Sequence, residues 1–294
     1  DTIQESTLES MKGYTTVALF GLDTRQAGQL GSGNRSDTVI IASINNDTGE
    51  VRLASVFRDT YLDMTTGKFN KANSAYSTGG PEQAIKMLNK NLDLTIEKYI
   101  SVDFAAMTDA VDLLGGIDID VDETEIDHLN NYMVETSKVT GVASKPLTHT
   151  GLQTLDGVQA TSYCRIRYTA GDDFKRTERQ REVIQELVRK AKTMEISKIN
   201  DIINAVFPKI ATNYSNKELL EMAPQMIGYD IADTAGFPFD RETGTISGRG
   251  SCVIPVNLAE NVRQLHEFLY ENYDYTPSSE VQKISEQITA DTGY

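Results

Sequence analysis

"TVIIASINNDTGEVRLASVF" occupies residues 38–57 and decides the fold class. Residues 38–44 are β-branched and apolar almost throughout, as expected of a strand that is covered on both faces. Residues 45–50 are rich in Asn, Asp, Thr and Gly, which favour turns, and residues 51–57 are again largely apolar. We therefore predict an antiparallel hairpin over this stretch.

Strands and helices are interleaved around the hairpin. The patterns predict further strands at 14–20, 98–102 and 117–121, and helices at 81–92, 103–114, 177–194, 216–227 and from 257 onward. Interleaved strands and helices are typical of an α/β sandwich, and the antiparallel hairpin makes its sheet mixed rather than all parallel. Residues 122–150 are polar and fit no single pattern.

Residue types at the predicted helix ends support these assignments. Asp103 is placed to cap the helix that Gly115 ends, and Pro81 suits the first position of a helix. Ser215 and Glu218 have the spacing of a capping box, and so do Thr177 and Gln180, and we expect a third helix start at Asn257. We predict a linker over residues 1–12 and a single domain over 13–294.

The composition limits the class of partner. The chain has 294 residues and a formal net charge of -15, which argues against duplex DNA or RNA, because phosphate binding requires a broad basic face. No run of 18 apolar residues could span a bilayer, but the chain starts at Asp1 and its first methionine is Met11. We therefore expect that a signal or anchor segment preceded Asp1. Cys164 and Cys252 form no CxxC motif, and we expect free thiols rather than a disulfide.

One segment of this acidic chain is strongly basic. "CRIRYTAGDDFKRTERQ" (164–180) carries five cationic side chains. If the segment is extended, Arg165 and Arg167 project to the same side, and Arg176 lies at the mouth of the helix predicted from Thr177. A helix N-terminus attracts anions, and arginine binds phosphate oxygens bidentately. A solvated loop whose arginines pair with Asp172 and Asp173 is the alternative, and the segment alone does not decide between them.

Aspartate and arginine recur at three predicted strand ends. Asp23 follows the first strand, Arg35 and Asp37 precede the second, and Arg58 and Asp59 follow the third. Loops at strand ends are where sites on open α/β sheets gather. Two carboxylates can hold Mg²⁺ when substrate phosphate oxygens complete its coordination, although any single Asp–Arg neighbour pair is more often structural.

Seven segments, in order, resemble the LytR-CpsA-Psr family of bacterial cell-wall enzymes, most clearly over residues 14–195. They are "FGLDTR" (20–25), "RSDTVI" (35–40), "SVFRDTYL" (55–62), "KANSAYSTGGPEQA" (71–84), "VDFAAMTDAVDLLGGIDIDV" (102–121), "GLQTLDGVQATSYCRIRY" (151–168) and "DDFKRTERQ" (172–180). The resemblance implies a three-layer α/β/α sandwich with a central mixed β-sheet. It also implies a location outside the cytoplasmic membrane, with an N-terminal membrane helix as anchor.

The resemblance further implies a reaction and a set of site residues. Family members transfer a glycopolymer, such as wall teichoic acid or capsular polysaccharide, from a polyprenyl-pyrophosphate carrier to a muramic acid hydroxyl of peptidoglycan. Asp23 and Asp37 match the aspartates associated with Mg²⁺. The residues that match the pyrophosphate-binding set are Arg35, Arg58, Lys71, Arg165, Arg167, Arg176 and Gln180.

The chemistry of the reaction is that of phosphoryl transfer. Mg²⁺ and the arginines, with Arg58, Arg165 and Arg167 as the catalytic ones, would stabilise the charge that develops as polyprenyl phosphate leaves. Asp59 or Asp173 would act as a base or orient a neighbouring arginine. Two alternatives stay open on the sequence: a pyrophosphatase that uses water as acceptor, and a non-catalytic regulator that binds polyprenyl phosphates.

Overall fold

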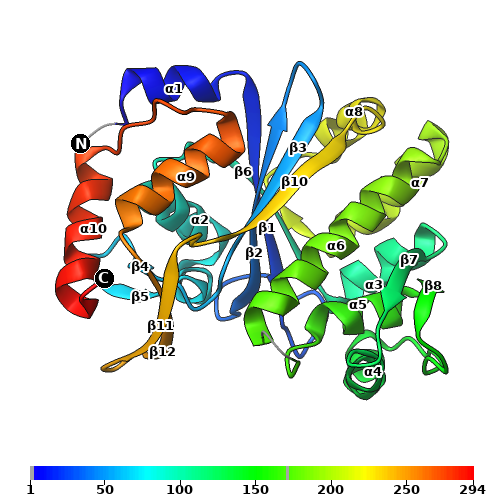
Figure 1. The fold of residues 1–294 in the computed structure, drawn as a ribbon. Coiled ribbons are helices and arrows are strands. Elements are labelled where there is room, and N and C mark those ends of the chain that lie inside the picture. The colour runs from blue at the N-terminus through cyan, green and yellow to red at the C-terminus, as the bar shows by residue number, and fades with distance from the viewer. Residues whose placement is uncertain (1–2, 170–171) are drawn as a thin grey trace. The chain divides into compact units, whose positions relative to one another are not determined.

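The computed structural model describes residues 3–169 and 172–294 (Figure 1). The chain divides into two compact units. Unit 1 comprises residues 1–20, 31–100 and 231–294, and unit 2 comprises residues 21–30 and 101–230. Because each unit collects separated segments, residues far apart in the sequence share a core. The predicted linker over residues 1–12 contains a helix, α1 (Glu5–Met11), in which Thr7 and Met11 are buried. Residues 1–2 of the linker lie outside the part of the chain that the structure describes.

Unit 1 is built on a β-sheet. Its strands run in the order β10-β3-β2-β1-β6, with β1 at Tyr14–Leu22, β2 at Ser36–Asn45, β3 at Glu50–Val56, β6 at Lys98–Asp103 and β10 at Asp230–Phe237. Strands β2 and β3 pair antiparallel, with Ile40 opposite Ser55, so the predicted hairpin is confirmed. The predicted α/β class with a mixed central sheet is confirmed as well.

Helices and two small hairpins complete unit 1. Helix α2 (Asn73–Leu92) packs against β2, α9 (Leu258–Tyr270) packs against β2 and β3, and α10 (Ser279–Thr292) packs on α2 and α9 (Figure 1). One hairpin pairs β4 (Tyr61–Asp63) with β5 (Phe69–Lys71), and the other pairs β11 (Arg241–Ile246) with β12 (Gly250–Pro255). The packed helices and hairpins hold the loop after β3, which carries Arg58, and the end of β5, which carries Lys71.

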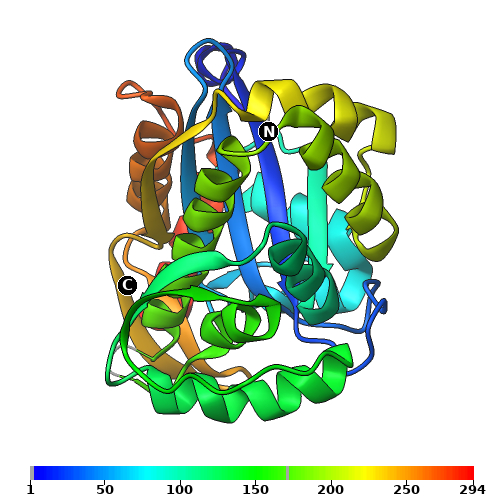
Figure 2. The same ribbon diagram turned by 90° about the vertical axis from the view of Figure 1, so that its right-hand side faces the viewer.

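Unit 2 is mostly helical. Its helices are α3 (Phe104–Leu113), α4 (Ile126–Thr140), α5 (Gly157–Arg165), α6 (Asp172–Lys192), α7 (Ile196–Val206) and α8 (Asn216–Met226), with a 3₁₀ turn at Phe207–Lys209. Strands β7 (Ile117–Val121) and β8 (Gly151–Leu155) pair antiparallel, and β9 is the short strand Ala211–Thr212. Helices α7 and α8 lie side by side, as Figure 2 shows in yellow-green and yellow.

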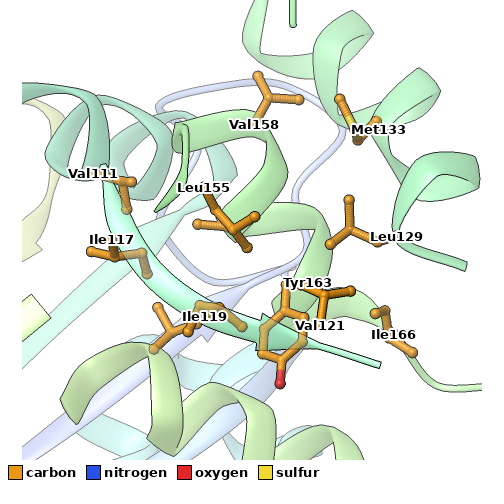
Figure 3. Packing of buried hydrophobic residues seen from close by; sticks show 12 residues of the cluster. Val111, Ile117, Ile119, Val121, Leu129, Met133, Leu155, Val158, Tyr163 and Ile166 are labelled. Carbon is orange, nitrogen blue, oxygen red and sulfur yellow. The ribbon is translucent and has the colours of Figure 1, made fainter. Parts of the chain in front are cut away.

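The apolar core of unit 2 positions the helix that carries Arg165. Alternate residues of β7, namely Ile117, Ile119 and Val121, point to one side and pack with α4 and α5 (Figure 3). Tyr163 and Ile166 come from the end of α5 and the residue after it. Residues 122–150, which fit no single pattern in the sequence, contribute α4 and its buried Leu129 and Met133.

Several predicted helix starts are confirmed. The Asp103 carboxylate accepts from the Ala106 amide, and Ser215 with Glu218 forms a complete capping box at α8. Asn257 caps α9. Pro81 starts the second part of α2, as predicted, because non-helical backbone at Gly79 and Gly80 interrupts the helix just before the proline. The first part of α2 begins at Asn73. The KANSAY segment therefore starts the helix.

Two predictions within the basic segment are wrong. Helix α6 begins at Asp172 and not at Thr177, since Asp172 and Asp173 provide the acidic first turn that a helix dipole favours. The Thr177 hydroxyl donates to the Phe174 carbonyl inside the helix instead of capping it. Arg176 is therefore one turn inside the helix. Arg165 is not in an extended segment, because it is the last residue of α5.

Candidate functional site

In unit 1 the strand register creates an ion pair. Extending the pairing of β2 and β3 by three residues sets Asp37 opposite Arg58, and Arg58 Nη1 donates to Asp37 Oδ1 at 2.9 Å. Asp59 lies beside two cations, with its carboxylate oxygens 3.9 Å from Arg58 Nε and 3.6 Å from Lys71 Nζ. All four side chains are partly exposed. The start of β2, the loop after β3 and the end of β5 thus bring two cations and two carboxylates together.

Arg35 belongs to the same part of unit 1. It directly precedes β2, where the chain enters the sheet, and its side chain is exposed. Among residues 3–169 and 172–294 it forms no ion pair or hydrogen bond. An exposed arginine next to an Asp37–Arg58 pair can accept an anion without first breaking a salt bridge of its own.

In unit 2, Arg165 is held on several sides. Its guanidinium carbon lies 4.4 Å from the centre of the Phe104 ring and 5.2 Å from that of Tyr132. Nη2 donates to Glu135 Oε2 at 2.8 Å, and Nη1 donates to Thr136 Oγ1 at 3.1 Å. Cation–π contacts and a hydrogen bond to a buried hydroxyl restrict the guanidinium to one position. We call these contacts the Arg165 cradle.

Arg167 has different surroundings. It follows Ile166 after the end of α5 and is half-buried. Within the described part of the chain no carboxylate pairs with it. A partly desolvated guanidinium without a carboxylate partner has an unmet preference for negative charge, which a phosphate group satisfies. Arg167 is therefore the residue of the basic segment best suited to bind an anion.

Two other predicted ligands make internal contacts. Arg176 Nη2 lies 2.6 Å from Asp173 Oδ1, and both side chains are largely buried. This pair agrees with the alternative in which arginines of the segment meet its own aspartates. Gln180 Nε2 donates to the Cys164 carbonyl at 3.3 Å, so that this amide group holds the end of α5.

The predicted magnesium ligands supply suitable donor atoms. Asp23 is an exposed residue just after β1 in unit 2, and Asp37 is a partly exposed residue of β2 in unit 1. Within the described residues no group of three or more His, Cys, Asp or Glu side chains could hold a metal ion. Mg²⁺ typically uses one or two carboxylates together with substrate phosphates and water, so the donor chemistry of the two aspartates fits this ion.

Several residues that contact the basic segment were not predicted from the sequence. Phe104 and Tyr132, which contact Arg165, look in the sequence like ordinary core residues of two separate helices. Glu125 pairs with Arg179 through a 2.6 Å contact between two buried side chains. Arg179 is the fifth cation of the basic segment and is adjacent in sequence to Gln180, which matches a family ligand. This position could have pointed to the pair.

The two cysteines are free, as predicted. Desolvation raises the pKa of the Cys164 thiol to about 12, and it also raises the pKa of Cys252. Both thiols are therefore protonated at neutral pH. A protonated thiol is a poor nucleophile, so neither side chain is suited to covalent catalysis.

The structure has the α/β fold that the sequence resemblance implies. Arginines suited to bind anions lie at the ends of its strands and helices, as that class of protein requires. The profile of the LytR_cpsA_psr family matches residues 2–249, and the chain belongs to this family. No helix in the described ranges, 3–169 and 172–294, is long and apolar enough to cross a membrane.

Particular relatives are named as teichoic acid transferases. The chain is 32% identical over 211 residues to polyisoprenyl-teichoic acid–peptidoglycan teichoic acid transferase TagU of Enterococcus faecalis, covering 71% of this chain and 64% of that protein. It is 28% identical over 289 residues to the corresponding TagV of Bacillus subtilis, covering 94% of this chain and 69% of that protein. The chain thus spans about two thirds of the length of these relatives.

Solved structures share the fold. The structure of B. subtilis TagV superposes with a TM-score of 0.69 at 24% identity, covering 90% of this chain and 99% of that one. A structure described as TagT bound to LI-WTA gives a TM-score of 0.65 at 21% identity, covering 97% and 93%. At these identities the likeness establishes the fold.

Proposed function

We propose that this chain is a phosphotransferase that moves a glycopolymer from a polyprenyl-pyrophosphate carrier to a muramic acid hydroxyl of peptidoglycan. The observation that carries the proposal is the half-buried Arg167, which no carboxylate neutralises within the described residues, next to the cradled Arg165. The names of TagU and TagV, which state transfer of teichoic acid to peptidoglycan, support teichoic acid as the class of cargo.

In the proposed reaction the acceptor hydroxyl attacks the phosphorus bonded to the sugar. The bond from this phosphorus to the bridging oxygen breaks, polyprenyl phosphate leaves, and the proton of the acceptor hydroxyl is released to water. Arg165 and Arg167 would bind the diphosphate, and the family resemblance assigns Arg35, Arg58, Lys71, Arg176 and Gln180 to the same ligand. One arginine that meets transition-state charge contributes about 10³–10⁵ in rate in related phosphoryl transfers.

The carboxylates have separate proposed roles. Asp23 and Asp37 would hold Mg²⁺, which supplies charge stabilisation to phosphate oxygens when bound. Asp59 and Asp173 each lie beside cations, at 3.6 Å from Lys71 Nζ and 2.6 Å from Arg176 Nη2. A carboxylate in contact with a cationic side chain can hold that side chain in one position. We therefore assign Asp59 and Asp173 to orienting these cations.

The location belongs to the proposal as well. Teichoic acid and peptidoglycan, in the relatives' names, are cell-wall polymers, so we place the reaction outside the cytoplasmic membrane. Attachment through an N-terminal membrane helix follows from the family resemblance and stays an expectation.

Transfer from a lipid-linked donor to peptidoglycan tests the proposal. We expect Arg165→Ala and Arg167→Ala each to lower transfer by at least 10²-fold, because each removes a cation from the developing charge. Arg189→Ala is the matched control, since Arg189 is an exposed arginine of α6 that pairs with Glu186 and Asp118. Near-normal transfer by both variants would refute the assignment. Free polymer phosphate without any peptidoglycan conjugate would instead identify a pyrophosphatase.

A further inference from the structure

Arg179 is the most deeply buried cation of the basic segment. Its side chain is 2% exposed, and that of its partner Glu125 is 5% exposed. A diphosphate cannot reach a guanidinium that is both covered and neutralised by a buried carboxylate. Arg179 therefore does something other than bind the substrate directly.

The three donor nitrogens of Arg179 point to three different acceptors. Nε donates to Glu125 Oε2 at 2.6 Å, Nη1 donates to the Ile166 carbonyl at 3.2 Å, and Nη2 donates to Thr169 Oγ1 at 2.9 Å. Ile166 and Thr169 stand on either side of Arg167 and Tyr168. The guanidinium thus ties both ends of a four-residue segment that carries Arg167.

Glu125 is itself fixed at the start of α4. Its Oε1 accepts from the Asp122 amide at 3.2 Å, and its own amide donates to Asp122 Oδ1 at 2.9 Å. At the other end, the Asp172 amide donates to the Thr169 carbonyl at 3.0 Å, where α6 begins. The segment 166–169 is therefore held by the Arg179 side chain, which Glu125 fixes to the start of α4, and by the backbone at the start of α6.

We propose that Arg179, neutralised by Glu125, is a positioning residue that sets where Arg167 projects. The inference rests on the proposed function in so far as Arg167 binds the diphosphate. A lysine could keep the charge opposite Glu125, but it lacks the planar fork that reaches the Ile166 carbonyl and the Thr169 hydroxyl together. Arg179→Lys therefore separates the positioning role from simple charge balance.

A double-mutant cycle on donor turnover tests this role. Because small misplacements of a binding group cost up to about 10²-fold, we expect Arg179→Lys to lower kcat/KM on the order of tenfold to hundredfold. In an Arg167→Ala background the same change should have no further effect, since the group to be positioned is gone. Losses that multiply in the double variant would overturn the inference. Arg189→Lys makes the same substitution at an exposed arginine of α6 and should leave turnover unchanged.

A second readout does not depend on activity. Amide hydrogen exchange of residues 167–169 should become faster in Arg179→Lys, while exchange in the middle of α5 and α6 stays as in the wild type. If Arg179→Lys does not fold, the same exchange is measured in Thr169→Val. This change removes the hydroxyl that accepts from Arg179, and it alters only a partly exposed loop residue. Unchanged exchange in the folded variant overturns the positioning role. If the wild type shows no transfer, the proposed function fails, and hydrogen exchange still decides on Arg179.

Discussion

At the scale of single residues, the surroundings of Arg165 show which contacts hold a cation. The contact to Glu135 is short, at 2.8 Å, but the Glu135 side chain is 57% exposed, and an exposed pair contributes only about 0–1 kcal/mol. The Phe104 and Tyr132 rings cover a guanidinium that is only 10% exposed, and cation–π contacts gain strength with desolvation. The aromatic part of the cradle is therefore the stronger one.

A substitution at Phe104 tests this comparison. Phe104→Leu keeps an apolar side chain but removes the ring, and we expect binding of a polyprenyl-pyrophosphate ligand to weaken by about 3- to 30-fold, the equivalent of a lost cation–π contact of about 0.6–2 kcal/mol. Glu135→Gln is the comparison variant. It removes a carboxylate that competes with phosphate for Arg165, so that binding should stay equal or become tighter. Isothermal titration calorimetry measures both, and weaker binding in Glu135→Gln alone would contradict the comparison.

At the scale of elements, α5 is placed by a close approach to α3. A Cβ atom built on Gly157, the first residue of α5, would lie 2.1 Å from the Thr108 carbonyl oxygen of α3. Thr108 and Thr161 bring their hydroxyl oxygens to 3.0 Å across the same pair of helices. Only glycine permits this spacing, and Arg165 at the other end of α5 depends on it.

Gly157→Ala should therefore be strongly destabilising. Backbone atoms of two helices would have to move apart, and we expect the free energy of unfolding to fall by about 1–3 kcal/mol or more, measured by urea denaturation. Gly31→Ala is the matched control, because no atom lies within 4 Å of the Cβ that it adds. Equal stability of the two variants would show that α3 and α5 can separate without cost.

At the scale of the whole chain, buried polar groups connect the C-terminal helices to the end of α2. His266 of α9 is fully buried, and its Nε2 donates to the Leu92 carbonyl at 2.9 Å. Its ring stacks on that of Tyr275 with centroids 4.0 Å apart. The Tyr275 hydroxyl donates to Asp93 at 2.6 Å, and the Ser278 hydroxyl donates to the same carboxylate at 2.7 Å.

This arrangement predicts a pH dependence of stability. Burial lowers the pKa of His266 from 6.5 to about 4, so that the folded chain keeps the ring neutral while the unfolded chain protonates it. The contribution of His266 is complete above pH 6.5 and is lost progressively as the pH falls to 4, by about 3 kcal/mol in total. Urea denaturation at pH 7 and pH 4.5 should show a smaller loss of stability on acidification in His266→Gln than in the wild type. The exposed His149→Gln should behave as the wild type, and an equal loss in all three chains would exclude His266 as the cause.

The sequence by itself determined the elements that local patterns encode. The hairpin at 38–57, the cap at Asp103 and the capping box at Ser215 follow from side-chain period and from hydrogen bonds within a few residues. The ordered motifs were enough to predict the family. The start of α6 was predicted wrongly, because Thr177 and Gln180 have capping-box spacing inside a helix that already begins at Asp172.

Only the tertiary structure decided how the cations of the basic segment differ. Arg165, Arg176 and Arg179 look alike in the sequence, yet one lies in an aromatic cradle, one pairs with Asp173 and one is buried against Glu125. Their partners come from α3, α4 and the first turn of α6. Whether a guanidinium is exposed to substrate depends on contacts between elements distant in sequence, which no local pattern records.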